Sequence, residues 1–339
     1  MTETLIVVRA PNWLGDTVMA LPALWAIRAG WPDARIAVVG PWVGVLSGQG
    51  VADLVVAYPR DHLRRRAVDR VLAIERPDLA VLLPNSLAAA VAARRWRARR
   101  RLGFATDARA VLLTDALPPP DPRRHQVDEY LELAERAGGR PGDDRPRWKR
   151  RADPAADLEV ARLLEEAGVP GARNGEGAPR PVVGLHLGAA GGAAKRWEPE
   201  RFGELGAALS RGGATPLLLG GPDDLDAAAR AVAGAGHPLA SLVGRDRPDL
   251  LPSVLAGLAC LVSGDTGVAH LAAALDVATV TLFGPTDARR TAPRGPRARV
   301  IDRGVPCAPC FLRECPIDHP CLRGVGAAAV AECVLEAVA

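Results

Sequence analysis

The chain has 339 residues, of which 48% are hydrophobic, and its formal net charge is +4. This length is typical of two domains, and the apolar content is sufficient for two cores. No apolar run approaches the roughly 18 residues of a membrane span, and no basic residues precede Leu5–Val8 as they would in a secretory signal. We therefore expect a cytoplasmic protein whose cysteines are reduced.

Arginine accounts for all but two of the 43 basic residues, and the two lysines are Lys149 and Lys195. Asparagine occurs only as Asn12, Asn85 and Asn174. A GC-rich genome explains this composition, so arginine runs carry less functional weight. The remaining lysines and asparagines carry more, and three of them lie in the motifs described below.

The first part of the chain alternates apolar runs with helical patterns, which predicts a parallel sheet with helices on both faces. Because Pro22 falls just past the start of the first helical pattern, we expect a kink or a late start there. The predicted strands are Leu5–Arg9, Arg35–Val39, Asp53–Ala57, Leu79–Leu83 and Arg100–Phe104. The predicted helices are Thr17–Arg28, His62–Glu75, Ser86–Arg97 and His125–Ala137.

Two loose tracts, Gly138–Arg151 and Pro170–Pro181, flank a predicted helix at Pro154–Ala167 and indicate a domain boundary. The predicted organisation is a first domain at 1–150, a linker with one helix at 151–181, a second domain at 182–325 and a terminal helix at 326–339.

The alternation of strands and helices resumes in the second domain. Its predicted strands are Val182–Leu187, Thr215–Leu219, Leu239–Val243, Cys260–Val262 and Thr279–Phe283. Its predicted helices are Pro199–Ser210, Asp223–Ala233, Asp249–Ala259 and Val268–Leu275. The fold class is therefore α/β, with two doubly wound, Rossmann-like domains whose parallel sheets face a central cleft. Ligands of such sheets bind outside the carboxyl ends of the strands.

Residues 263–270 read Ser-Gly-Asp-Thr-Gly-Val-Ala-His and join an apolar run to a helical pattern. Backbone amides at such a helix start favour phosphate, so we expect the amides of Thr266 and Gly267 to bind phosphate oxygens. A diphosphate would repel Asp265, which instead caps the helix or accepts hydrogen bonds from sugar hydroxyls. His270 lies on the same helical face as Thr266; its alternative is a buried, hydrogen-bonded core histidine.

Two further loops of the second domain follow predicted strands. The loop at 186–197 contains Gly188, where the backbone can approach a ligand closely, and Lys195, whose charge suits phosphate. The alternative is a flexible surface loop with a solvated lysine. After the next strand, Asp224 could accept hydrogen bonds from a ribose, although a helix cap explains it equally well.

In the first domain, Asp16 follows a strand within Pro-Asn-Trp-Leu-Gly-Asp-Thr, and Asn85 and Ser86 follow another strand. Helix capping is the alternative role for Asp16 and for Ser86. The chain has neither a GxxxxGK[ST] loop nor a GxGxxG fingerprint, which argues against a nucleotide hydrolase or a dehydrogenase.

Five segments together resemble the lipopolysaccharide heptosyltransferase II family and occur in that family's order. They are residues 11–24, 83–86, 194–197, 264–270 and 282–286. The resemblance implies a GT-B fold and an inverting, metal-independent glycosyltransferase without a cofactor. The implied donor is ADP-L-glycero-D-manno-heptose, and the implied acceptor is the heptosylated inner core of lipopolysaccharide. One departure is Leu187-Gly188, where the family usually has Pro-Gly.

The resemblance also implies roles for individual residues. The family's proposed base falls on Asp16, its phosphate lysine on Lys195 and its adenosine-side acid on Asp224. The remaining donor-binding residues would be Gly188, Asp265, Thr266, Gly267 and His270, and the acceptor-binding residues Asn12, Asn85, Ser86 and Arg97. Two alternatives remain: a GT-B enzyme using another nucleotide sugar, or a non-catalytic module that binds sugar nucleotides.

Clustered cysteines and arginines complete the sequence. The spacing of four cysteines could bind zinc: Cys307, Cys310, Cys315 and Cys321. We favour a different interpretation, in which they are reduced thiols that pack a loop, and prefer it to a zinc site or a disulfide. Arg94–Arg101 contains the densest basic run, with Arg64–Arg66 nearby in sequence. Its interpretations are a solvated face, or contact with acceptor phosphates or the inner-leaflet membrane surface. Because no nucleic-acid motif accompanies it, we expect no binding of nucleic acid.

We expect the protein to be a monomer that is peripheral to the inner membrane.

Overall fold

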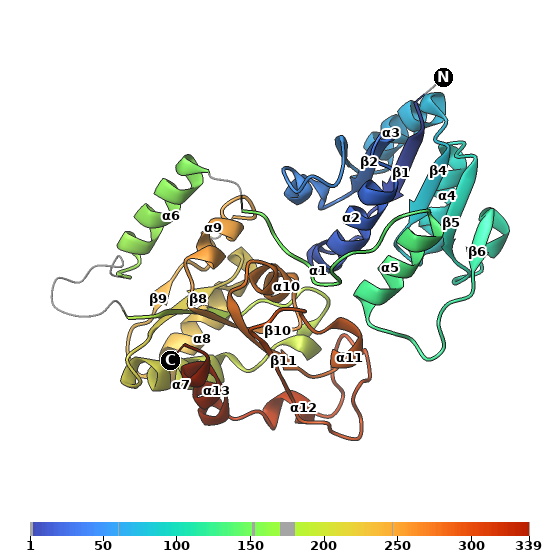
Figure 1. The fold of residues 1–339 in the computed structure, drawn as a ribbon. Coiled ribbons are helices and arrows are strands. Elements are labelled where there is room, and N and C mark those ends of the chain that lie inside the picture. Colours follow the sequence, from blue (N-terminus) through green and yellow to red (C-terminus); the bar gives the residue numbers. More distant parts are fainter. Residues whose placement is uncertain (1–2, 60, 151–152, 170–179, 246, 339) are drawn as a thin grey trace. The chain divides into compact units, whose positions relative to one another are not determined.

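The computed structural model describes residues 3–59, 61–150, 153–169, 180–245 and 247–338. The chain forms two compact units, Met1–Lys149 and Arg150–Ala339 (Figure 1). Most of the predicted loose tract Pro170–Pro181 lies outside the described residues, as does Arg151 of the first tract. Among the described helices, none is both long and apolar enough to cross a membrane.

The first unit is built on a six-stranded parallel sheet with the strand order β3-β2-β1-β4-β5-β6. This order reverses between β1 and β4, as in dinucleotide-binding folds. The strands are β1 (Leu5–Arg9), β2 (Arg35–Gly40), β3 (Leu54–Ala57), β4 (Leu79–Leu82), β5 (Arg100–Phe104) and β6 (Asp115–Leu117).

Helices cover both faces of this sheet. Leu72 and Ala90, from two different helices, pack in one cluster with the strand residues Val7, Val39 and Leu82. On the other face α2 packs against α5. The helices are α1 (Leu14–Met19), α2 (Leu21–Gly30), α3 (His62–Glu75), α4 (Leu87–Arg95) and α5 (Gln126–Arg136), with single 3₁₀ turns at Val43–Leu46 and Ala110–Leu112.

The second unit repeats the same topology. Its parallel sheet has the order β12-β11-β10-β7-β8-β9, which reverses between β7 and β10. The strands are β7 (Val182–His186), β8 (Thr215–Leu219), β9 (Ala240–Ser241), β10 (Cys260–Gly264), β11 (Ala278–Phe283) and β12 (Ala298–Asp302). The two doubly wound α/β sheets that the sequence predicts are therefore confirmed.

Eight helices of the second unit are described, of which α7, α8 and α13 contribute to one core cluster with β7, β10 and β11. They are α6 (Pro154–Glu166), α7 (Pro199–Arg211), α8 (Leu225–Ala235), α9 (Leu251–Ala256), α10 (Gly267–Ala274), α11 (Ala288–Thr291), α12 (Pro320–Arg323) and α13 (Ala327–Val338). Short 3₁₀ turns lie at Ala193–Lys195 and Pro222–Asp224.

The elements differ from the predictions mainly at sheet edges. The sequence reading misses β6 and β12, which are edge strands whose side chains are only partly buried and therefore show no continuous apolar run. The predicted break near Pro22 is confirmed, because α1 and α2 are separated at Ala20. The first helix nevertheless starts at Leu14, three residues earlier than predicted.

Helices α7 and α8 pack so closely that glycines form part of the contact. A Cβ atom on Gly203 of α7 would overlap the carbonyl oxygen of Ala231 in α8, and one on Gly234 would lie 2.6 Å from the carbonyl oxygen of Glu200. The backbones could not approach to this distance with any larger residue at Gly203.

We predict that Gly203→Ala lowers the free energy of unfolding by roughly 1–3 kcal/mol, because the helices must separate to admit the methyl group. Urea unfolding followed by circular dichroism measures this loss. Gly257→Ala is the matched control, since its Cβ would meet only ordinary contacts of 3.5 Å or more. Equal stability of both variants would show that the helix contact tolerates separation.

Candidate active site

Most of the predicted site residues, but not Asp224 or Arg97, follow the strands at which each sheet reverses its order. In the first unit Asn12 and Asp16 follow β1, and Asn85 and Ser86 follow β4. In the second unit, Gly188 and Lys195 follow β7, and the group from Asp265 to His270 follows β10. The carboxyl ends beside such a reversal are where open α/β sheets bind ligands.

Asp16 lies in the first turn of α1 and is half-buried. The N-cap of α1 is Trp13, so Asp16 is not the N-cap residue considered as its alternative. Instead, a hydrogen bond links its carboxylate to the hydroxyl of Tyr130 in α5. Burial, and then the negative charges of Asp16 and Glu129, raise the pKa of Tyr130 well above its usual value. The hydroxyl therefore stays protonated and donates to Asp16.

A buried arginine at the end of β1 fixes Asn12. The Arg9 guanidinium donates to Asn12 Oδ1 at 2.6 Å and lies 5.1 Å from the centre of the Tyr58 ring. Burial lowers the pKa of Arg9 to about 10, so it remains charged at neutral pH. The sequence predicts Arg9 only as the last residue of a strand and does not indicate this role.

A second buried arginine organises the loop after β4. Arg109 donates to the carbonyl oxygen of Phe104 at 2.8 Å, to those of Pro84 and Ser86, and to Asn85 Oδ1 at 3.3 Å. Ser86 is the N-cap of α4 and accepts from the Ala89 amide at 3.4 Å, so the capping role applies to it. The sequence does not predict a role for Arg109, because arginine is abundant in this chain and no motif surrounds it.

In the second unit, Lys195 Nζ forms an ion pair with Asp265 Oδ2 at 2.7 Å. Asp265 does not cap α10: the N-cap is Thr266, which makes no side-chain cap bond. The Thr266 hydroxyl is instead 2.8 Å from the Ser263 hydroxyl, which donates to the Gly264 carbonyl oxygen at 3.0 Å. The first amides of α10 are thus left without a side-chain cap, next to a lysine.

Asp224 fixes the loops after β7 and β8 to one another. It is buried, accepts from the Gly221 amide at 3.0 Å and pairs with Arg196 at 2.8 Å. Its first bond satisfies the N-cap amide of the 3₁₀ turn, so the capping alternative holds. A Cβ on Gly188 would lie 2.7 Å from Asp224 Oδ2, so a larger residue would displace this carboxylate.

His186, the last residue of β7, is a neighbour of Asp224 that the sequence reading does not select. Burial lowers the pKa of its imidazole to about 4, and the charge of Asp224 offsets this only in part. Within the described part of the chain, its buried Nδ1 atom has no hydrogen-bond partner. His270 is also buried, in the first turns of α10.

Comparison with known proteins identifies the chain. A family model described as glycosyltransferase family 9 (heptosyltransferase) matches residues 65–320. The chain belongs to glycosyltransferase family 9. It is 30% identical over 319 residues to lipopolysaccharide heptosyltransferase 2 of Salmonella typhimurium, covering 87% of both proteins, and 29% identical to that of Escherichia coli K12 with the same coverage.

Solved structures agree with this family assignment at the level of the fold. The E. coli ADP-heptose lipopolysaccharide heptosyltransferase II superposes with a TM-score of 0.77 at 24% identity, over 99% of this chain and 98% of that one. A family 9 glycosyltransferase from Veillonella parvula gives a TM-score of 0.81 at 18% identity, over 99% and 97%. The family 9 enzyme described here therefore has the fold of these two proteins.

The structure does not bring Arg97 together with the other predicted acceptor residues of this enzyme. Arg97 lies between α4 and β5, and the Arg99 amide close by donates to Pro77, just before β4. Arg97 is therefore at the amino edge of the sheet, whereas Asn12, Asn85 and Asp16 follow the carboxyl ends. Its position in sequence, directly after a helix, already indicates this edge.

The four cysteines whose spacing can bind zinc are not brought together as a metal site. Cys307 and Cys310 are exposed, Cys315 is half-buried, Cys321 is buried, and all are free thiols. In the described ranges, no three His, Cys, Asp or Glu side chains are placed to hold a metal ion. Cys315 Sγ instead accepts from the His319 amide at 3.2 Å, and burial raises the pKa of Cys321. Of the four, Cys321 alone is buried.

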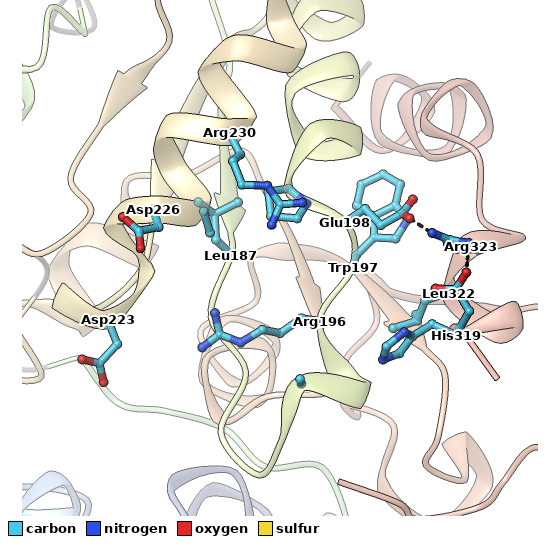
Figure 2. Close-up of a pocket in the computed structure, with 14 residues that line it drawn as sticks. Leu187, Arg196, Trp197, Glu198, Asp223, Asp226, Arg230, His319, Leu322 and Arg323 are labelled. Atoms are coloured by element: carbon cyan, nitrogen blue, oxygen red, sulfur yellow. Dashed lines mark hydrogen bonds and ion pairs between the residues drawn. The ribbon is translucent and has the colours of Figure 1, made fainter. Parts of the chain in front are cut away.

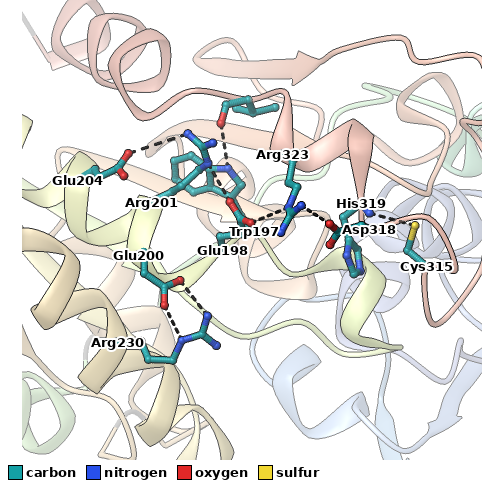
Figure 3. Close-up of polar contacts among 11 residues, drawn as sticks. Trp197, Glu198, Glu200, Arg201, Glu204, Arg230, Cys315, Asp318, His319 and Arg323 are labelled. Atoms are coloured by element: carbon teal, nitrogen blue, oxygen red, sulfur yellow. Dashed lines mark hydrogen bonds and ion pairs between the residues drawn. The ribbon is translucent and has the colours of Figure 1, made fainter.

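A pocket of about 300 Å³ lies beside the β7 loop (Figure 2). Leu187, Trp197 and Leu322 supply apolar lining, and Arg196 lines it as well, but Lys195 and Asp265 do not. Several charges around it form ion pairs (Figure 3): Arg323 with Glu198 at 2.9 Å and with Asp318, and Arg230 with Glu200 at 2.7 Å. These pairs link the start of α7 to α8 and to α12.

We predict that His186 makes the second unit sensitive to acid. Because its folded pKa of about 4 lies below the usual value of 6.5, the unfolded chain binds more protons between these values. The free energy of unfolding should therefore fall as the pH drops from 6.5 to 4, and less steeply in His186→Gln. Thermal unfolding across this range measures the difference. The exposed His237→Gln is the control and should follow the wild type; parallel curves for all three proteins would contradict the prediction.

Proposed function

We propose that the chain transfers heptose from ADP-L-glycero-D-manno-heptose to the heptosylated inner core of lipopolysaccharide. The relatives named lipopolysaccharide heptosyltransferase 2 support these substrates. The observation that carries the chemistry is the carboxylate of Asp16, held by a buried tyrosine hydroxyl at the point where the first sheet reverses its order.

Asp16 acts as the general base in this proposal. The acceptor hydroxyl oxygen forms a bond to the anomeric carbon of heptose while the bond from that carbon to the ADP oxygen breaks. Asp16 takes the proton of the hydroxyl, and ADP leaves as an anion. A single displacement inverts the configuration of the anomeric carbon, so the reaction is inverting.

The second unit holds the donor. Lys195 and the uncapped amides at the start of α10 are suited to diphosphate oxygens and would stabilise the leaving ADP. When Lys195 turns to the diphosphate, Asp265 becomes available to accept hydrogen bonds from heptose hydroxyls. The lysine and the helix start provide the positive charge that the leaving group requires, and the proposed transfer therefore uses no metal ion.

Gly188, Asp224 and His270 complete the proposed donor site. Asp224 keeps the β7 and β8 loops together and offers its carboxylate to the ribose side. In the first unit, Asn12 and Asn85 bind acceptor hydroxyls, because arginines orient both carboxamides. Ser86 stays near them through its cap. The acceptor is attached to a lipid, so we place the enzyme at the cytoplasmic surface of the inner membrane, as a monomer.

Asp16→Asn tests the base directly. We expect kcat to fall by about two to four orders of magnitude, since the amide cannot take the proton, while calorimetry finds unchanged affinity for ADP-heptose. Asp33→Asn, an exposed aspartate of the same unit, should keep full activity. Turnover of Asp16→Asn at the wild-type rate would rule out Asp16 as the base. Turnover of another nucleotide sugar in preference to ADP-heptose would overturn the donor.

Tyr130→Phe tests how Asp16 is held. Removing the hydroxyl should lower kcat roughly tenfold and leave KM for ADP-heptose unchanged, because an interaction needed for the chemical step is lost. Tyr58→Phe is the matched control: it removes the other tyrosine hydroxyl, which is buried and donates to Asp69 at 2.7 Å. Both variants should unfold at lower temperature, but only Tyr130→Phe should lose turnover. An equal loss of kcat in both would indicate a general structural effect.

A further inference from the structure

Helix α3 packs on the first sheet with one side and exposes an apolar stripe on the other. The packed side is marked by Leu72, which is buried in the core, and by Asp69, which accepts hydrogen bonds from buried aromatic side chains at 2.7 Å. Leu63, Val71 and Ile74 are 75%, 59% and 80% exposed.

These three exposed residues share one side of the helix. They are separated by eight and three residues, and residues at such spacings fall on the same face of a helix. The exposed Ala67 lies midway between Leu63 and Val71 and continues the stripe. A single exposed leucine needs no explanation, but a row of aliphatic side chains directly opposite the packed side indicates a surface that something apolar covers.

Arginines flank the stripe on both sides. Arg64 lies along one side, and Arg66 and Arg70 lie along the other. All three are exposed, and within the described ranges no ion pair involves any of them. The acidic residues of α3 do not neutralise them, because Asp69 faces the core and Glu75 pairs with Arg35 at 3.3 Å.

We propose that the α3 face, made of Leu63, Arg64, Arg66, Arg70, Val71 and Ile74, docks the protein on an anionic phospholipid bilayer. A helix in this position lies in the membrane plane, with its apolar stripe at the boundary between headgroups and acyl chains. The arginines reach lipid phosphates on either side, since a guanidinium pairs well with phosphate oxygens. A nucleic acid would account for the arginines alone and an apolar protein partner for the stripe alone, whereas an anionic membrane accounts for both.

The docking surface extends the membrane association in the proposed function and specifies where it occurs. The first turn of α3 follows β3 and so lies at the carboxyl edge of the sheet, the edge that carries Asp16 and Asn85. A bilayer held along α3 would thus adjoin the edge at which we propose that the lipid-linked acceptor binds.

Vesicle sedimentation of the full chain tests the proposal, with vesicles of phosphatidylcholine alone and mixed with phosphatidylglycerol. We expect the wild type to sediment only with the anionic vesicles. The triple variant Arg64→Gln, Arg66→Gln, Arg70→Gln should lower the partition coefficient roughly a hundredfold, and high salt should have a similar effect. The triple variant Leu63→Ser, Val71→Ser, Ile74→Ser should lower it at least about tenfold, with less dependence on salt.

Matched controls separate this surface from charge and hydrophobicity in general. Arg136→Gln, Arg140→Gln, Arg211→Gln removes the same charge from exposed positions elsewhere, and Leu158→Ser, Leu225→Ser removes exposed leucines of the second unit. Both should bind vesicles like the wild type. Binding of either α3 variant at the wild-type level would overturn the proposal. So would a wild-type dimer, detected by light scattering, that the serine variant dissociates.

Transfer to a water-soluble, lipid-free acceptor distinguishes failure of docking from failure of the proposed reaction. Both α3 variants should transfer to that acceptor at the wild-type rate, because the α3 face holds no proposed site residue. If the wild type binds anionic vesicles but transfers no heptose, the docking surface stands and the proposed substrates are wrong.

Discussion

Parallel pairing of the strands is the constraint from which the candidate site follows. Each strand must return to the starting edge through a crossover, so the loops that follow the strands gather at one edge of the sheet. Where the order reverses, at β1 and β4 and again at β7 and β10, neighbouring crossovers run to opposite faces. The same topology in both units thus produces two ligand-binding edges, and the residues placed on them decide which chemistry each performs.

Buried charges then fix the loops at these edges. Arg9 and Arg109 are buried in the first unit, and each donates to backbone carbonyl oxygens and to an asparagine side chain. A buried guanidinium is unfavourable unless its hydrogen bonds are made, so the loops cannot move without leaving the charge unsatisfied. Asp224 and Arg196 bind the second-unit loops in the same manner. The proposed ligand-binding groups are thereby preorganised.

The sequence predicts the central strands and the loops after them because those strands are buried on both faces and read as apolar runs. The role of a residue cannot be predicted from the sequence where it depends on a partner far away along the chain. The local pattern around Asp265 allows a helix cap as well as a ligand contact, and only the fold brings Lys195 to it. Tyr130 lies more than a hundred residues from Asp16, and nothing near either residue indicates that they meet.

The number of arginines in the chain and the positions they occupy are two different kinds of evidence. A GC-rich genome accounts for the number of arginines, and for that reason the run at Arg94–Arg101 is weak evidence in the sequence. Much of that run is in fact paired, with Asp69, Asp78 and Asp115. Codon bias cannot, however, select one face of a helix. Three of the four arginines of α3, Arg64, Arg66 and Arg70, flank an exposed apolar stripe in the described structure, and we base the proposed membrane contact on this combination of position, exposure and charge.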